Sequence, residues 1–211
     1  MLVAFRILRI LFILVISFST LTAQSEPITY TISTQLSRVT FHIEHQGFID
    51  LVGTLRVAPG VFVFDNDDWT KSSAAIVMTT RSIDLGDAFW NSAVRKDESW
   101  ANLFKYPAIS FKSTGLMKSD ATHGKMFGEL TLAGVTKSIE LDLKVNKIGI
   151  NQVSEFPSVG FSASTSVKRS EFGLDAYEDL VGDTMGIQIE VEAFVGKDPG
   201  ADHDQAASGS M

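Results

Sequence analysis

The sequence predicts an all-β protein whose strands close into an antiparallel, up-and-down barrel of about eight strands. Three observations favour this fold. Segments with alternating apolar and polar residues recur along the chain, helix signals are few, and a length of 211 residues suits one domain. Long amphipathic strands in an open sheet would leave exposed edges, whereas a barrel pairs every strand. The interior of such a barrel is either filled by side chains or wide enough for one ligand.

The N-terminal segment 1–25 has the pattern of a secretory signal peptide. Two arginines precede an apolar run at 10–16, and small residues follow it. Cleavage after Ser25 places Ala23 at the −3 position; cleavage after Ala23 is the less suitable alternative. An uncleaved membrane anchor is disfavoured because a span needs roughly 20 apolar residues. We therefore expect export and removal of this segment.

The composition narrows the classes of function. The chain has no cysteine, so neither a disulfide nor a lipidated cysteine can stabilise or anchor it. With 25 acidic and 18 basic residues, and no cluster of basic residues, it is a poor partner for nucleic acid. Residues 197–211 lack periodicity and are rich in small and polar residues, which predicts a disordered tail. Residues 26–196 then form the single barrel domain.

The alternating segments locate the strands in order along the chain. The alternation is clearest in 137–146, where Ile139, Leu141 and Leu143 alternate with polar residues, so one face meets an apolar interior. The predicted strands are 28–34, 38–46, 50–57, 74–81, 108–114, 125–132, 137–146, 157–168 and 185–195, with 61–64 as a short extension.

The segment 84–106 departs from this alternation. It combines aromatic with charged residues, and residues 88–105 could carry one or two helical turns with the aromatic side chains on one side. A connection this long between strands usually has a function or packs on the fold. We expect a short helical, aromatic segment across one end of the barrel. It is either a lid over a ligand or a plug that never touches one.

An ordered set of motifs resembles the YceI-like family, over residues 30–195. The motifs are a Gly-x-Leu-Thr-Leu-x-Gly-Val-Thr-Lys hairpin at 128–137, Arg-Ser-x-Phe-Gly at 169–173, Val-Gly-Asp at 181–183, Phe41 and His45, Ser-Ile-Asp at 82–84, and Tyr-Pro at 106–107. The resemblance implies a lipocalin-like barrel in the bacterial periplasm that encloses a long isoprenoid or other lipid chain. The chain departs from the family at Arg95-Lys96-Asp97 and Trp100-Ala101, where members usually show Arg-Asp and a Phe-Phe pair; both departures affect the mouth of the barrel.

The inward faces of the predicted strands supply the candidate lining of a lipid site. A buried chain gains about 0.8 kcal/mol per methylene, so an apolar interior suffices to bind it. If the phenylalanines of the chain fill the interior instead, the barrel is solid and needs no ligand. The candidate interior residues are Val39, Phe41, Ile43, Ile139, Leu141, Leu143, Phe161 and Ile189.

The candidate rim residues each have a functional and a structural interpretation. Arg169 could receive an anionic or carbonyl head group, or form a salt bridge with a carboxylate at Glu171, Asp175 or Asp183. His45 could contact a polar ligand end or a neighbouring backbone group. Arg95 and Asp97 in the 84–106 segment either contact a head group or belong to a solvated, charged face. The candidate rim residues are His45, Arg95, Asp97, Trp100, Arg169 and Phe172.

Signals for catalysis and for metal binding are weak. The chain has neither a cysteine nucleophile nor a Gly-x-Ser-x-Gly motif, and His42 and His45 point to opposite faces of their strand. We predict no enzyme, no catalytic residue, no metal and no cofactor besides the lipid. An enzyme would use His45 as a base oriented by Asp97 or Asp183. A secreted structural or partner-binding barrel with a filled core is a further alternative.

The sequence thus predicts an exported lipid-binding protein that stores or transports a polyprenyl or quinone-like chain. Its partner is a long-chain lipid or isoprenoid. We expect neither nucleic-acid binding nor stable membrane insertion, and either a monomer or a homodimer.

Overall fold

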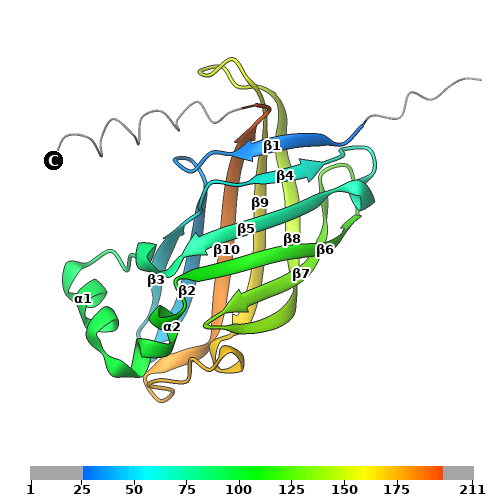
Figure 1. The fold of residues 1–211 in the computed structure, drawn as a ribbon. Helices are drawn as coiled ribbons and strands as arrows, with labels where there is room; N and C mark the ends of the chain where they lie inside the picture. The colour runs from blue at the N-terminus through cyan, green and yellow to red at the C-terminus, as the bar shows by residue number, and fades with distance from the viewer. Residues whose placement is uncertain (1–25, 197–211) are drawn as a thin grey trace, which may run out of the picture.

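The computed structural model describes residues 26–196, so the predicted signal peptide at 1–25 and the predicted tail at 197–211 lie outside the described residues. Strands dominate the described part, and the helices gather at one end (Figure 1). The strands are β1 (Ile28–Ile32), β2 (Arg38–His45), β3 (Ile49–Arg56), β4 (Val61–Phe64), β5 (Ser73–Thr79), β6 (Ala108–Lys118), β7 (His123–Leu132), β8 (Val135–Ile150), β9 (Pro157–Lys168) and β10 (Val181–Phe194). The helices are α1 (Ala88–Lys96) and α2 (Ala101–Lys105), accompanied by 3₁₀ turns at Trp69–Lys71, Thr80–Ser82, Glu98–Trp100 and Arg169–Phe172.

The strands form a closed, wholly antiparallel barrel, as the sequence predicts. Strands β4 to β10 follow one another as a meander, and β1 pairs with both β4 and β10, which closes a ring of eight strands. The hairpin of β2 and β3 pairs with β10 below this closure, and two isolated bridges, Thr54 to Asp84 and Val57 to Met78, connect it toward β5. This hairpin therefore widens the barrel at the end where the helices lie (Figure 1).

Three strands extend four residues beyond a predicted end, and each has an irregularity in its pairing. β6 and β8 continue past register shifts at Ser113/Gly115 and Val145/Lys147, and β10 begins early at Val181. A bulge moves the inward face to residues of the other parity, which ends a strict period of two in the sequence. The segment 61–64, predicted as an extension, is the separate strand β4, which pairs with both β1 and β5.

Aromatic side chains fill the barrel at the end away from the helices. The rings of Phe62 and Phe64 each contact Phe161 edge-on, with centroids 5.3 and 5.0 Å apart. Tyr30 stacks on Phe62, and Trp69 contacts Phe64, with centroids 5.5 and 5.6 Å apart. Such contacts are favourable beyond the area they bury. This end of the barrel is a packed core.

Two phenylalanines in the other half lie flat against the barrel wall. Phe41 lies directly opposite Gly53 on β3, and a Cβ atom at Gly53 would sit 2.2 Å from the Phe41 ring. Phe111 covers Gly128 on β7 in the same way, at 2.3 Å. Because glycine leaves space above the sheet, each ring packs on the wall. These pairs keep the interior of this half open.

The segment 84–106 forms the helical cover of the barrel. Asp87 accepts a hydrogen bond from the Trp90 N–H and begins α1. Arg95 near its end donates to the carbonyls of Asn91 and Ile83, which ties the helix to the preceding turn. Within residues 26–196 no helix is long and apolar enough to cross a membrane.

Candidate functional site

The half of the barrel beneath the helical cover holds an apolar cavity of about 450 Å³. Strands β2, β3 and β5 to β10 supply its walls, and α1 and the segment 174–181 close its end. Carbon atoms form nearly the whole lining. A volume of this size lies within the range of small-molecule sites in proteins, about 300–1,000 Å³. The interior is therefore hollow here, in contrast to the packed aromatic end.

A second, smaller chamber of about 90 Å³ continues the cavity toward the packed end. Five side chains border both spaces and form the constriction between them: Val39, Met78, Phe111, Leu141 and Ile189. Since all five are apolar, the two chambers form one apolar path along the barrel axis. A chain that fills the first chamber meets this constriction before it reaches the second.

The predicted interior residues all line one or both of these chambers. Phe41, Ile43 and Ile139 line the main cavity, and Leu143 and Phe161 line the second chamber. Val39, Leu141 and Ile189 border both. Phe41, Ile43, Ile139 and Ile189 are inward-facing yet only partly buried, because the cavity exposes them. Their contact with a ligand stays a prediction.

The cavity opens at the helical end between three segments. Gln46 at the β2–β3 turn, Trp90 on α1, and Tyr177 and Leu180 before β10 both line the cavity and are exposed to solvent. The Gln46 N–H donates to the Leu180 carbonyl at 2.9 Å, and the rings of His45 and Trp90 lie 6.0 Å apart. These contacts hold the three segments around one mouth.

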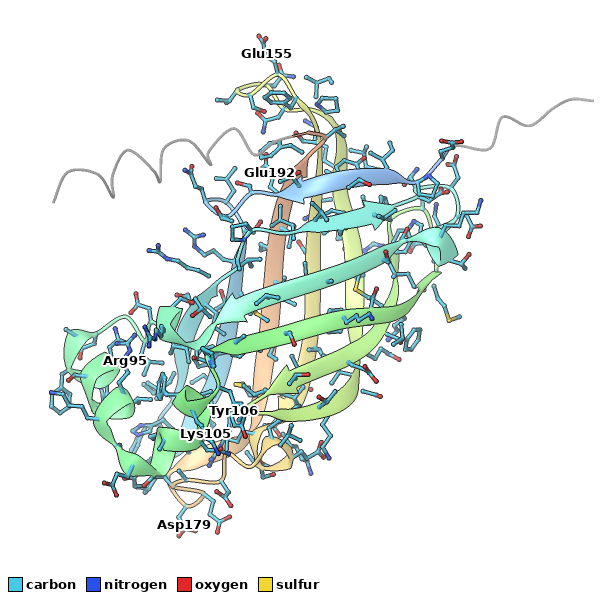
Figure 2. The ribbon with its side chains drawn as sticks, in the orientation of Figure 1. Arg95, Lys105, Tyr106, Glu155, Asp179 and Glu192 are labelled. Atoms are coloured by element: carbon cyan, nitrogen blue, oxygen red, sulfur yellow. The ribbon has the colours of Figure 1, made fainter. Side chains whose placement is uncertain are left out.

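Four of the six predicted rim residues lie at this end of the cavity: His45, Asp97, Trp100 and Arg169 line it. Arg95 on α1 (Figure 2) does not: its guanidinium donates to the Ile83 carbonyl, and Trp90, Ala93 and Val94 of the same helix line the cavity instead. Phe172 does not line it either, because it packs beneath its loop with only 1% of its surface exposed. Gly173 follows it with a φ of 69°, a conformation that glycine adopts readily.

Arg169 is a buried cation held by backbone carbonyls. Its Nε donates to Gly182 at 2.9 Å, one terminal nitrogen to Val181 at 2.7 Å, and the other to Leu174. Within the described residues no carboxylate lies in salt-bridge range of it, so none of the predicted pairs with Glu171, Asp175 or Asp183 forms. The guanidinium also lies over the Trp100 ring, 5.8 Å from its centroid. Arg169 therefore brings an unpaired positive charge to the cavity wall.

Asp97 and Tyr177 connect the helical cover to the segment before β10. The Tyr177 hydroxyl donates to Asp97 Oδ2 at 2.6 Å, and the Ser99 N–H donates to its Oδ1 at 2.9 Å. These hydrogen bonds, the Tyr177 bond first, hold the pKa of the Asp97 carboxyl below its ordinary value. The Asn102 amide donates to the Gly173 carbonyl at 3.3 Å, a second link between the same segments.

The residues proposed for an enzyme do not come together. His45 contacts Gln46 and Trp90, whereas the hydrogen bonds of Asp97 go to Tyr177 and Ser99, and Asp183 accepts from the Ser170 N–H. In residues 26–196 no group of three or more His, Cys, Asp or Glu side chains could hold a metal ion. The arrangement suits binding of an apolar molecule.

Several lining residues escaped the sequence analysis. Met78 and Phe111 shape the constriction, and Tyr177 and Leu180 form part of the mouth. Inward alternation in 74–81 and 108–114 could have indicated the first two. Residues 174–181 have no alternation, and Tyr177 has a left-handed φ of 56°, so nothing local in the sequence indicates where its ring lies.

Comparison with known proteins gives a consistent result. The family model of the YceI-like domain matches residues 30–193. A UPF0312 protein of Serratia proteamaculans is 32% identical over 159 residues, covering 75% of this chain and 81% of the relative. Protein YceI of Escherichia coli O157:H7 is 31% identical over 154 residues, covering 73% and 79%.

Solved structures share the fold. BcnA of Burkholderia cenocepacia aligns with a TM-score of 0.65 at 20% identity, covering 76% of this chain and 98% of that one. A polyisoprenoid binding domain from Saccharophagus degradans aligns with a TM-score of 0.58 at 11% identity, covering 81% and 100%. At these identities the likeness concerns the fold.

Proposed function

This protein belongs to the YceI-like family, and we propose that it binds one lipid chain of the isoprenoid type inside its barrel, for storage or transport. The observation that carries the proposal is the cavity of about 450 Å³ with its almost wholly apolar lining. Family and fold are those of binding proteins, and one protein of this fold is a polyisoprenoid binding domain. We include export to the periplasm in the same proposal, because residues 1–25 have the sequence pattern of a secretory signal peptide.

The size of the cavity limits the enclosed chain. Taking about 30 Å³ for each water-sized group, the main cavity accommodates about fifteen carbon atoms, or about three isoprene units. The second chamber adds space for about three more. A longer polyprenyl or quinone tail would extend beyond the mouth or displace the side chains of the constriction.

The polar end of the ligand belongs at the mouth. The deep lining offers no charged group, whereas His45, Asp97 and Arg169 all border the cavity at its helical end. Arg169 makes three hydrogen bonds to carbonyls, and a guanidinium has five N–H donors, so donors are left for a carbonyl or anionic head group. We therefore place the chain inward and the head group beside Arg169.

The experiment that tests this function is binding of a fluorescent farnesyl probe to protein freed of lipid by solvent extraction. Ile189→Trp should abolish binding, because Ile189 borders both chambers and the larger ring fills the constriction. Gln188→Trp is the matched control, because Gln188 is the exposed neighbour on the same strand. Equal binding by wild type and Ile189→Trp would place the ligand elsewhere and reject the proposal.

A further inference from the structure

Large apolar side chains gather on the surface around the mouth of the cavity. They come from three segments: the β2–β3 turn, the start of α1 and the loop before β10. Phe48 and Phe89 are the most exposed, at 83% and 72%. We call this surface the mouth collar; its members are Phe48, Ile49, Phe89, Trp90, Tyr177 and Leu180.

Contacts between the three segments make the mouth collar one surface. The rings of Phe89 and Trp90 lie edge to face with centroids 5.7 Å apart, and Trp90 lies against His45. Gln46, two residues before Phe48, is joined to Leu180 by a backbone hydrogen bond. The helices and the loop that carries Asp179 lie at the same end of the barrel (Figure 2). Exposed apolar groups that gather in this way usually mark an interaction surface.

The mouth collar is continuous with the cavity. Trp90, Tyr177 and Leu180 belong to both, being exposed outside and in contact with the cavity inside. A lipid chain that leaves a bilayer against this surface would reach the cavity without crossing water. A protein partner at the same place would cover the entrance instead. The continuity of apolar surface therefore favours a lipid partner.

The charged residues that neighbour the mouth collar in the sequence indicate the lipid charge that it would favour. Every charged residue within two positions of a collar member is acidic: Asp50, Asp87, Asp175, Glu178 and Asp179. Carboxylates repel the phosphates of anionic lipids, which attract basic segments instead. Trp and Tyr favour the interface between water and lipid because each ring has an apolar body and a polar edge.

We propose that the mouth collar is a docking surface for an uncharged lipid bilayer, on which the protein lies peripherally with its cavity open to the membrane. The direction of lipid transfer rests on the proposed function, whereas docking does not require it. The contact we propose is of the interfacial kind, in which exposed apolar side chains enter the boundary between head groups and acyl chains.

Flotation with phosphatidylcholine vesicles tests the proposal, using protein expressed from the full chain and purified from the exported fraction. The double variant Phe48→Ser, Phe89→Ser should lower the partition coefficient about tenfold for each ring removed. Both side chains are exposed, so the variant should unfold at the same temperature as wild type. The control is Ile150→Ser, Val153→Ser, because these apolar residues are also exposed, near the β8–β9 turn at the opposite end, and their replacement should leave binding unchanged.

Three results would overturn docking to an uncharged bilayer. The first is equal flotation of wild type and the collar variant. The second is tighter binding to equimolar vesicles of phosphatidylcholine and phosphatidylglycerol. The third is a wild-type dimer that the collar variant dissociates in analytical ultracentrifugation without any vesicle binding, which would make the collar an interface between copies.

A parallel titration separates this proposal from the proposed function. A farnesyl probe delivered from solution should bind the collar variant as it binds wild type, because neither Phe48 nor Phe89 lines the cavity. Vesicle binding without probe binding would reject the lipid cavity and keep the docking surface. Probe binding without vesicle binding would reject the docking surface and keep the lipid cavity.

Discussion

Two glycines decide whether this barrel is hollow. Phe41 and Phe111 would project into the lumen if the neighbouring strands carried side chains at Gly53 and Gly128. With glycine there, each ring lies on the wall and the lumen stays open. A count of phenylalanines in the sequence cannot distinguish a filled barrel from a hollow one, because the outcome depends on these cross-strand pairs.

Gly53→Ala should therefore reduce lipid binding while the protein remains folded. The three atoms nearest to the new methyl group belong to the Phe41 ring, so the ring must turn into the cavity. Overpacking of this kind costs about 1–3 kcal/mol. Probe titration measures the affinity and thermal unfolding the stability. Gly115→Ala is the control, because no atom lies within 4 Å of its added methyl group; an equal loss in both variants would exclude the explanation.

Asp120 makes the β6–β7 turn sensitive to acid. Its carboxylate accepts from the N–H groups of Thr122 and His123 at 2.8 and 2.9 Å and lies 3.1 Å from His123 Nδ1. These hydrogen bonds lower the pKa of Asp120 from 3.8 to about 2. A lowered folded-state pKa gives stability that is present above the unfolded value and is lost as the pH falls toward about 2.

Asp120→Asn should remove this part of the acid sensitivity. The variant and wild type should differ in urea midpoint above pH 3.8, and the difference should shrink as the pH falls toward about 2. The comparison isolates Asp120 from other carboxyls with lowered pKa values, such as Asp84 and Asp183. A difference that stays constant with pH would show that the carboxylate charge has no such role.

At the scale of elements, the helical cover is joined to the loop before β10 by few contacts. The hydrogen bonds from Tyr177 to Asp97 and from Asn102 to Gly173 are its polar links, and the Trp100 and Tyr177 rings lie 6.4 Å apart. Because α1 lines the cavity, the cover is a wall of the site and not a remote plug. A wall held by so few links could open locally for ligand entry.

Tyr177→Phe should loosen the cover without changing the barrel. It removes the hydroxyl that donates to Asp97, so amide exchange in α1 should accelerate and release of the probe should become faster. The pKa of Asp97 should rise toward its ordinary value, since the Tyr177 bond is the main cause of its lowering. Tyr106→Phe is the control, because Tyr106 packs on Gly134 through its ring. Unchanged exchange in α1 would show that this bond does not hold the cover.

The strands were largely predictable from the sequence because alternation marks them directly. The predicted bounds were wrong at the bulges of β6 and β8, where the inward face changes parity. The bounds of β4 were predicted, but its four residues are too few for a pattern that marks a separate strand. The part of the site that lies on strands was predictable, because alternation indicates which side chains face inward. The partners of Arg169 were not predictable, because they are backbone carbonyls at the start of β10 and at Leu174, and a backbone carbonyl does not depend on the type of residue that carries it.

At the scale of the whole molecule, the barrel divides into a packed half and a hollow half. The aromatic cluster around Phe161 stabilises one end, so the other end can remain empty. The hairpin of β2 and β3 widens the hollow half, and the cover, the unpaired charge of Arg169 and the mouth collar all lie at its end. Stability and binding are therefore separated along the barrel axis.

This division also predicts selectivity for chain length. A farnesyl chain should bind more tightly than a geranylgeranyl chain, because the two chambers together accommodate about eighteen carbon atoms and the longer chain has about twenty. Met78→Ala should widen the constriction and favour the longer chain. Competition between the two chains for the farnesyl probe measures this preference. An unchanged preference in Met78→Ala would show that the constriction does not set the length.

The central claim is that the barrel holds a lipid chain, and native mass spectrometry of the protein purified from the exported fraction tests it most directly. The account predicts a discrete added mass that solvent extraction removes and that fragments in isoprene units. A bare protein mass that stays unchanged after incubation with a membrane lipid extract would contradict it.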